Sequence, residues 1–444
     1  MRYLLFFIVF FGLPNCLWVV QKFSISPQAI PLGLVNLLLI LAAGLWIFSR
    51  TQPPHLKNPI REYTIFTVLV VLWVGMAILT GFDRVVWNTL QDSKREISKL
   101  LLFFLPLGII KNRRDFAWFL GICLLVHFVI GLEVLRSGVL AGAHFNDSKR
   151  GAGPFGVGYW GTGDVAGGSD VAGAYLAQMI MFFLAFVVYG GIQLRIRIFC
   201  AAGAAILLAG TYATYARGAL LGVAAGMLVM TLIRKINTTR VILSVIISLV
   251  AFAYVPNGVF TRFHDIKSEN GKWGASTAGR LDYYDAALQI IEHYPLGVGT
   301  GQIRSAMQEY TGRAKGSMGK HVDPHNGFLY AACEYGIIGL IIFIALLWKM
   351  FAIAQSLFND ESMSPIYRVY SLGMTGMIAS LVVCNMFYAN FFKDMVLGTI
   401  AIHFGMLAFI KAVSLEKSAS FASATSSVGV NIHTAYHHIN RTVL

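Results

Sequence analysis

The chain is 444 residues long, and its composition excludes a soluble multidomain protein. Apolar residues make up 57% of it and charged residues only 13%, whereas soluble domains average about 25% charged residues. Mean hydropathy is +0.66. The net charge of +14 would suggest nucleic acid in a soluble protein, but in a membrane protein it first indicates cytoplasmic basic residues. We therefore expect a protein whose surroundings are the lipid bilayer, with no nucleic acid as partner.

Apolar runs predict about twelve transmembrane helices, since one span needs about 20 residues. They lie at 3–20, 30–48, 64–82, 97–110, 116–135, 171–192, 198–215, 218–233, 241–255, 328–347, 369–388 and 395–413. We expect the first to be a signal anchor, because Pro14, Asn15 and Cys16 form no cleavage site. The fold class is an all-α integral membrane protein with a large periplasmic helical loop between spans nine and ten.

Basic residues in alternate connections predict the orientation. With the N-terminus inside, Arg50, Lys111, Arg195 and Arg234 with their basic neighbours all face the cytoplasm, whereas most acidic residues fall in outward connections. The run Lys111–Asp115 would face outward without the short fourth span, so we keep that span. We expect a protein of the bacterial inner membrane with both termini in the cytoplasm.

Two long outward connections divide the chain into five expected parts. They are residues 1–150 with spans one to five and the start of the first loop, 151–255 with a Gly-rich loop and spans six to nine, 256–327 as a periplasmic loop, 328–416 with spans ten to twelve, and 417–444 as a cytoplasmic tail. Loops of this length usually carry function.

Cysteines and mid-span histidines indicate no metal site. The five cysteines stand singly in apolar stretches and read as small core residues. His127 and His403 lie within spans, and we interpret both as satisfied residues of the helix bundle. The chain has no DxD or HExxH metal motif, no GxSxG motif and no Walker loop, so we expect no metal and no cofactor.

The large loop contains a predicted helix with an arginine near its start. Leu281, Tyr284, Leu288 and Ile291 recur at helical spacing, Ser276 or Thr277 can cap the N-terminus, and Pro295 ends the pattern. This predicts an amphipathic helix outside the membrane. Arg280 in the first turn opposes the helix dipole, so it either is a solvated surface residue or holds an anion.

Arg217 and His325 also lie on the outward side of predicted spans. Arg217 stands between two apolar segments with almost no connector, where a charge is costly unless it anchors at the interface or lines a polar cavity. His325 directly precedes the tenth span, and Asp323 or Asn326 is near enough in sequence to orient it. A neutral imidazole is the commonest general base, although a lone loop histidine is often just a polar residue.

Residues 150–164 form a Gly-rich stretch after the fifth span. Its spacings resemble phosphate-binding loops, but no strand precedes it, so we expect an irregular outward loop whose backbone can approach a ligand. Arg150 at its start adds a third positive charge to the two arginines.

Three segments in this order resemble the O-antigen ligase and Wzy-type polymerase family. They are Thr214–Gly218, the stretch from Gly279-Arg280 to Gly299, and His325–Leu329 followed by Glu334–Leu340. Gly153-Pro154-Phe155 followed by Asp170–Ala172 is a fainter match, and the similarity spans roughly residues 150–345. Two departures are Ala216, where the family usually has Ser, and Asp164 or Asp170, where it often has Asn.

The resemblance implies a metal-independent membrane glycosyltransferase of lipopolysaccharide or polysaccharide biosynthesis. Such an enzyme moves a glycan from undecaprenyl diphosphate to a lipid or glycan acceptor, here lipid A core or a comparable acceptor. The family's arginines correspond to Arg217 and Arg280, which would stabilise the diphosphate leaving group, and its histidine to His325, which would activate the acceptor hydroxyl. We further expect Arg150, Asn326 and Tyr284 to bind substrate.

Three alternatives stay open at this point. A polymerase of the same family would use a second lipid-linked repeat unit as acceptor, and a protein O-oligosaccharyltransferase would use a protein. A transporter or flippase is a more distant alternative, because such proteins usually carry internal repeats and broken helices at mid-membrane. We find no internal repeat in the sequence.

Overall fold

The structure, a computed structural model, describes residue 3 and residues 61–81, 86–140, 150–155, 168–234, 275–311, 323–393 and 396–418. All regular elements within these ranges are helices. Eight of them are long and apolar enough to cross a membrane: α3 Arg61–Thr80, α6 Arg113–Leu140, α7 Gly168–Val188, α8 Leu194–Ala213, α9 Arg217–Arg234, α14 Gly327–Asn359, α15 Pro365–Asn385 and the last helix, Val396–Ser418.

These helices confirm the third, the fifth to eighth and the tenth to twelfth predicted spans. The chain is a multi-pass membrane protein. The predicted spans at 3–20, 30–48 and 241–255, and nearly all of the predicted tail, lie outside the described residues.

The fourth predicted span, 97–110, is not a membrane-length helix. Its region forms α4 Val86–Leu100, the 3₁₀ turn η3 Leu101–Phe103 and the short α5 Phe104–Ile109. Most of α4 is polar, so the apolar run that suggested a span covers little more than η3 and α5. The chain nevertheless runs back along α3, because the Tyr63 hydroxyl donates to the Leu100 carbonyl, 2.7 Å away.

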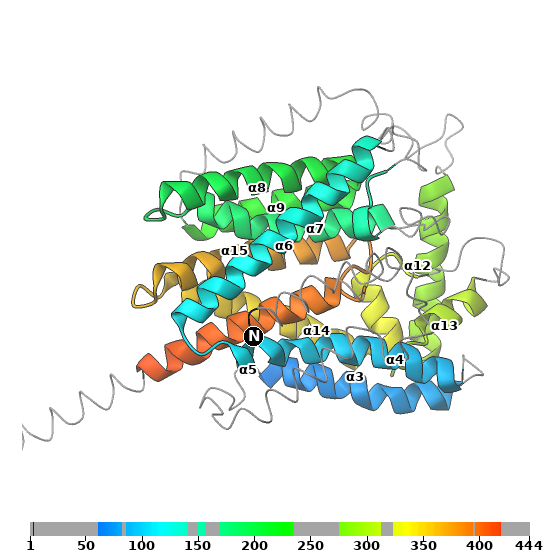
Figure 1. The fold of residues 1–444 in the computed structure, drawn as a ribbon. Helices are drawn as coiled ribbons and strands as arrows, with labels where there is room; N and C mark the ends of the chain where they lie inside the picture. Colours follow the sequence, from blue (N-terminus) through cyan, green and yellow to red (C-terminus); the bar gives the residue numbers. More distant parts are fainter. Residues whose placement is uncertain are drawn as a thin grey trace, which may run out of the picture.

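The long helices run between two ends of the molecule (Figure 1). We call one the basic end; it holds Arg61, Arg113, Arg234 and the α14–α15 turn. The other, which we call the loop end, holds the α8–α9 turn and the start of α14. Two further helices, α12 Ala275–His293 and α13 Ile303–Tyr310, lie at the loop end, and α12 runs across the ends of the long helices there (Figure 1).

Small residues bring α9 and α15 into close contact. Gly218, Gly222 and Gly226 repeat every fourth residue, which places them on one face of α9. A methyl group at Gly222 would overlap Cys384 and Ser380 of α15. This small-residue spacing is typical of membrane helices that pack backbone to backbone. It fixes the loop end of α9, where Arg217 lies, against the loop end of α15.

His127 and His403 lie in the bundle interior with hydrogen-bond partners, as the interpretation of satisfied bundle residues expects, and the structure adds that they bond to each other. Their Nε2 atoms are 3.1 Å apart, and Nδ1 of His127 lies 2.7 Å from the Tyr175 hydroxyl. Tyr370 donates to the His403 carbonyl and lies 3.0 Å from its Nδ1. Both rings are fully buried. The prediction of small core cysteines also holds for Cys123, Cys200, Cys333 and Cys384, which are free and buried.

A glycine-rich loop inserts into a break in α14. Gly336 has φ 71° and ψ −176°, which interrupts the helix. The Val298 and Gly299 amides donate to the carbonyls of Cys333 and Glu334, and the Ile337 amide donates to Pro295. A break at membrane depth is tolerated when protein covers it and supplies the missing hydrogen bonds. The loop therefore holds α12 and α13 firmly on the bundle.

The predicted loop helix exists, but its buried face differs from the predicted one. Ala286, Ala287 and Ile290 of α12 are buried, while Leu281 and Leu288 are exposed. Tyr284 and Ile291 are half-buried. The pattern of large apolar residues was misleading because two of the three residues on the buried face are alanines, and at Ala287 the helix comes close enough to α14 for the Cys333 thiol to reach its carbonyl at 3.4 Å.

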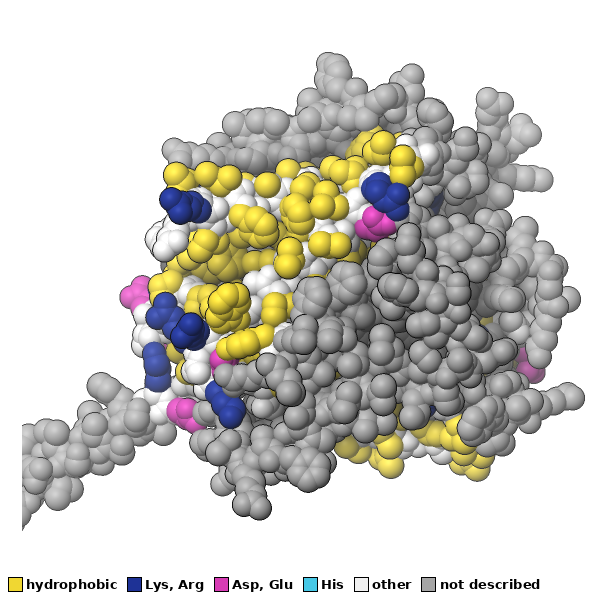
Figure 2. Space-filling view, viewed as in Figure 1, with side chains coloured by type: hydrophobic (Ala, Val, Ile, Leu, Met, Phe, Trp, Pro, Cys, Tyr) yellow, Lys and Arg dark blue, Asp and Glu magenta, His cyan; other side chains and the backbone are white. Residues whose placement is uncertain are grey.

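The bundle surface matches a membrane protein. Figure 2 shows a broad hydrophobic face between charged side chains that gather at its two edges. Exposed apolar residues on α6 and α8 include Trp118, Leu125, Leu132, Ile198 and Phe199. An exposed apolar band of this kind is what lipid tails require.

Candidate functional site at the loop end

Segments far apart in the sequence meet around the turn at residues 386–393, which follows α15. A methyl group at Gly218 would overlap Phe387, so the start of α9 lies against this turn. The Asn326 side chain reaches the Met386 carbonyl at 3.5 Å, and Lys393 forms an ion pair with Asp323. The turn itself is held by Asn385, whose side-chain oxygen accepts from the Phe391 amide. The site therefore gathers around a turn that we did not predict to be functional.

Arg217 is the first residue of α9, directly after a tight turn. Tyr215 has φ 51°, which is unusual for a non-glycine residue and marks the sharp reversal between α8 and α9. Thr214 stabilises the turn, because its hydroxyl accepts from the Ala216 amide at 3.2 Å and donates to Thr211. Arg217 is half-buried there. A permanently charged group is thus held at the loop end of the bundle.

Arg280 lies one turn further into its helix than predicted. Since α12 begins at Ala275, Ser276 and Thr277 fall within the helix and Arg280 falls in its second turn. Anion binding by free backbone amides at this N-terminus is therefore no argument for Arg280. Its half-buried guanidinium lies near enough to His325 to lower the histidine pKa.

His325 is held in an unusual backbone conformation by Asp323. Its φ is 48°, in the left-handed region, and its amide donates to Asp323 Oδ1 at 2.9 Å. Nδ1 of the ring lies 3.7 Å from the same oxygen, too far for a hydrogen bond but close enough for an electrostatic interaction. A left-handed residue outside glycine costs energy and occurs often at functional sites.

Asp323 is in turn held by Lys393. The two charged groups are 2.6 Å apart, and the Asp323 side chain is only 4% exposed. Burial alone would raise the pKa of Asp323, but Lys393 and then His325 lower it to about 2. Asp323 is therefore ionised throughout the neutral range. The order Lys393, Asp323, His325 forms a chain of charges that ends at the imidazole.

Two tyrosine rings enclose the histidine. The centroid of the His325 ring lies 5.4 Å from that of Tyr283 on α12 and 5.1 Å from that of Tyr388. Lys393 also lies over the Tyr388 ring at 4.7 Å. Tyr284, which we predicted to bind substrate, is half-buried, and it is its neighbour Tyr283 that faces His325.

The pKa of His325 lies below its ordinary value. Burial is the largest cause, and the positive charges of Arg280 and Lys393 act in the same direction. The carboxylates of Asp323 and Asp170 oppose the shift. The imidazole is consequently neutral near pH 7, as a general base must be.

Arg150 and Asn326 already have partners. Arg150 Nη1 lies 3.5 Å from Asp170 Oδ1 and 3.3 Å from Ser169 at the start of α7. The Asn326 side-chain oxygen accepts from the Phe328 and Leu329 amides, which caps α14. The structure thus gives Arg150 and Asn326 positions at the edge of the site with structural interactions of their own.

Lys393, Tyr388 and Tyr283 are members of the site that the sequence reasoning missed. Residues 386–388 ended the eleventh predicted span, Lys393 stood in the short connection before the twelfth, and no motif in the sequence assigned either a role.

Comparison with known proteins identifies one part of the chain. Residues 202–344 match a protein-family model described as O-Antigen ligase, Wzy_C. The match begins in α8 and ends in α14, so it includes Arg217, Arg280 and His325. It confirms the resemblance read from the motifs, while Gly153–Phe155 lies outside the matched residues. No curated protein matches the chain.

Proposed function

Since residues 202–344 match the O-antigen ligase family, a family of enzymes that transfer glycans, we propose that the chain is a ligase acting at the loop end. Its donor is a glycan on undecaprenyl diphosphate, and its acceptor is a hydroxyl of lipid A core or a comparable molecule. We place the loop end in the periplasm, as the distribution of basic residues predicts.

The observation that carries the proposal is the environment of His325. A neutral imidazole, an ionised Asp323 and the guanidinium of Arg280 lie close enough to influence one another. Arg217 begins the helix that packs against the same turn at residues 386–393. A base beside Arg280, with Arg217 on a helix that packs against the same turn, suits a reaction that removes a proton from one substrate and leaves negative charge on the other.

In the proposed reaction the acceptor oxygen attacks C1 of the sugar while His325 takes its proton. The bond between C1 and the phosphate oxygen breaks, and its electron pair stays on the diphosphate. Arg217 and Arg280 would stabilise that charge, since one guanidinium group can donate two parallel hydrogen bonds to phosphate oxygens. Asp323 then faces an imidazolium, and its negative charge stabilises the protonated ring.

Transfer by the purified protein, with lipid-linked donor and acceptor, tests this assignment. We expect H325A to lower the rate by about 100-fold to 10,000-fold, the range for loss of a general base. R217A and R280A should also lose most activity, because each removes charge from the leaving group.

The matched control is R136A. Arg136 lies near the loop end of α6, where it pairs with Glu133 on the surface, so its loss should leave the rate unchanged. Transfer that survives all three site substitutions would refute the assignment.

The acceptor is decided by the phenotype of a null mutant. A ligase defect leaves polymerised glycan unattached to lipid A core. Single repeat units in its place would identify a Wzy-type polymerase, and intact surface polysaccharide with unmodified protein would identify a protein O-oligosaccharyltransferase.

A further inference from the structure

A second polar site lies at the basic end, far from His325. It is a hollow of about 480 Å³ between the α7–α8 turn, the end of α9 and the α14–α15 turn. Its lining contains two arginines, one acidic residue and five neutral residues. The eight are Tyr189, Gly190, Ile233, Arg234, Phe358, Asn359, Glu361 and Arg368.

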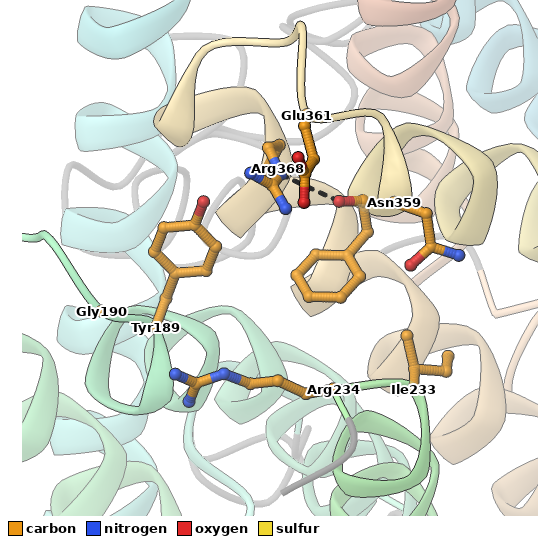
Figure 3. Close-up of a pocket in the computed structure, with 8 residues that line it drawn as sticks. Tyr189, Gly190, Ile233, Arg234, Asn359, Glu361 and Arg368 are labelled. Atoms are coloured by element: carbon orange, nitrogen blue, oxygen red, sulfur yellow. Dashed lines mark hydrogen bonds between the residues drawn. The ribbon is translucent and has the colours of Figure 1, made fainter.

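The two arginines enter this hollow from different helices. Figure 3 shows Arg234 and Arg368 on opposite sides, with the Tyr189 ring beside both. Arg368 uses Nε to donate to the Phe358 carbonyl at 3.0 Å, and its guanidinium lies 5.9 Å from the Tyr189 ring centroid. These contacts fix the side chain while leaving its two terminal nitrogens directed at the hollow.

Charge in the hollow favours an anion. Within the described ranges Arg234 makes no hydrogen bond or ion pair, and Arg368 has no carboxylate partner within 4.0 Å. Glu361 is the one acidic residue of the lining; it is exposed and offsets part of the positive charge. Two half-buried guanidinium groups facing one space are the arrangement that phosphate oxygens bind best.

We propose that this hollow binds a phosphate group, either the headgroup of an anionic membrane lipid or free phosphate. Its position supports the lipid, because it lies where four membrane-length helices end. Basic pockets between transmembrane helices at the cytoplasmic side are known to bind anionic headgroups. This inference does not depend on the proposed glycan transfer.

A phosphate bound at this site would also stabilise the packing of the helices that reach it. Its lining residues come from the basic ends of α7, α9, α14 and α15, whose other ends lie at Asp170, Arg217, His325 and the turn at 386–393. An 18-residue helix is about 27 Å long, so no direct contact links the two sites. A phosphate bound between Arg234 and Arg368 would instead stabilise the packing of these four helices.

Native mass spectrometry of the purified full-length protein tests the site, with phosphatidylglycerol and phosphatidylcholine as probes. We expect the wild type to retain phosphatidylglycerol and not phosphatidylcholine. R234Q/R368Q should weaken phosphatidylglycerol binding by about tenfold or more, since each charge-assisted contact contributes at least about a factor of ten. E361Q should strengthen it.

Two control variants separate loss of the site from a general loss of positive charge or of folding. R114Q removes an exposed arginine at the same end outside the hollow and should bind as the wild type does. R234K/R368K keeps both charges and should retain part of the affinity. It replaces the double glutamine variant in the comparison if that variant does not fold. Equal retention of phosphatidylglycerol by folded R234Q/R368Q, or equal binding of both lipids by the wild type, would overturn the proposal.

A separate arm distinguishes the two sources of phosphate. Ligands that bind only the folded state raise the unfolding temperature. If inorganic phosphate alone raises it in the wild type and not in R234Q/R368Q, the site is real and free phosphate is its ligand. If only phosphatidylglycerol does so, the ligand is the lipid.

Discussion

His325 stands among charges of both signs, and their balance sets its protonation. Asp323 and Asp170 favour the imidazolium, while Arg280 and Lys393 oppose it. The rings of Tyr283 and Tyr388 contribute burial, which also favours the neutral form. Since the pKa lies below the usual value near 6.5, catalysis that needs neutral His325 should fall only when the pH drops below that value.

Substitutions at Asp323 and Lys393 should move this acidic limit in opposite directions. D323N removes a negative charge that faces the ring, so the His325 pKa falls and activity persists to lower pH. K393M removes a positive charge and frees Asp323, so the pKa rises and activity is lost at higher pH. The measurement is the pH dependence of kcat/KM for glycan transfer.

If Asp323 and Lys393 had a purely structural role, their substitution would lower stability and activity without shifting the pH dependence of activity. Each single substitution leaves a buried charge unpaired and should destabilise the protein by about 3–5 kcal/mol. The double variant D323N/K393M removes both charges and serves as the control for stability. Two single variants that lose activity equally at every pH would refute an electrostatic influence on His325.

At the scale of elements, the sequence predicted which helices exist better than how they meet. The eight confirmed spans follow from unbroken apolar runs, and α12 follows from periodicity and Pro295. Polar α4 was missed because hydropathy locates membrane cores and not the helices that flank them. The predicted buried face of α12 was wrong because two of the residues that face the bundle are alanines, which a pattern of large apolar residues does not include.

The break in α14 gives the family motifs a physical explanation. The motif around Glu334 and Gly336 pairs with the one around Gly297, about 40 residues earlier, through backbone hydrogen bonds. The carboxylate of Glu334 also accepts from the Gly301 amide, and Glu334 is fully buried. Sequence alone reveals both motifs, but not that one completes the hydrogen bonds of the other.

Replacing Gly336 by alanine should strongly destabilise the protein. Its backbone lies in a region that is essentially restricted to glycine, and a methyl group would overlap Leu296 and Pro295. We expect a loss of at least about 2 kcal/mol, given a strain of about 1–3 kcal/mol before the overlap is counted.

The readout is the unfolding temperature in detergent, with G121A as the matched control. Gly121 lies in α6, and no atom lies within 4 Å of a methyl group placed there. The control should therefore be neutral or slightly stabilised, by up to about 1 kcal/mol. Equal unfolding temperatures for G336A and G121A would contradict the account of the break.

At the scale of the molecule, the fold separates two kinds of basic residue. Those at the basic end fit the expected cytoplasmic anchoring, and two of them line the proposed phosphate site. Arg217, Arg280 and Lys393 lie at the other end, and the last two act directly on His325. Composition gives only the total number of basic residues, because the side of the membrane on which each one lies depends on the path of the chain.

Labelling of introduced cysteines tests the orientation. Glu361 is exposed at the basic end and Glu292 is exposed on α12 at the loop end. With a membrane-impermeant maleimide on intact spheroplasts, we expect labelling of E292C and none of E361C. Both should react after permeabilisation. Labelling of E361C in intact spheroplasts would reverse the topology and place the loop end in the cytoplasm.

The most direct test of the central claim is a cryo-EM structure of the protein with undecaprenyl diphosphate bound. We predict that the diphosphate lies between Arg217 and Arg280, with the His325 ring beside the position of the sugar C1. The bound prenyl chain would follow the apolar surface between spans. A diphosphate bound away from these three residues, including one bound only between Arg234 and Arg368, would contradict the assignment of the loop end as the site of transfer.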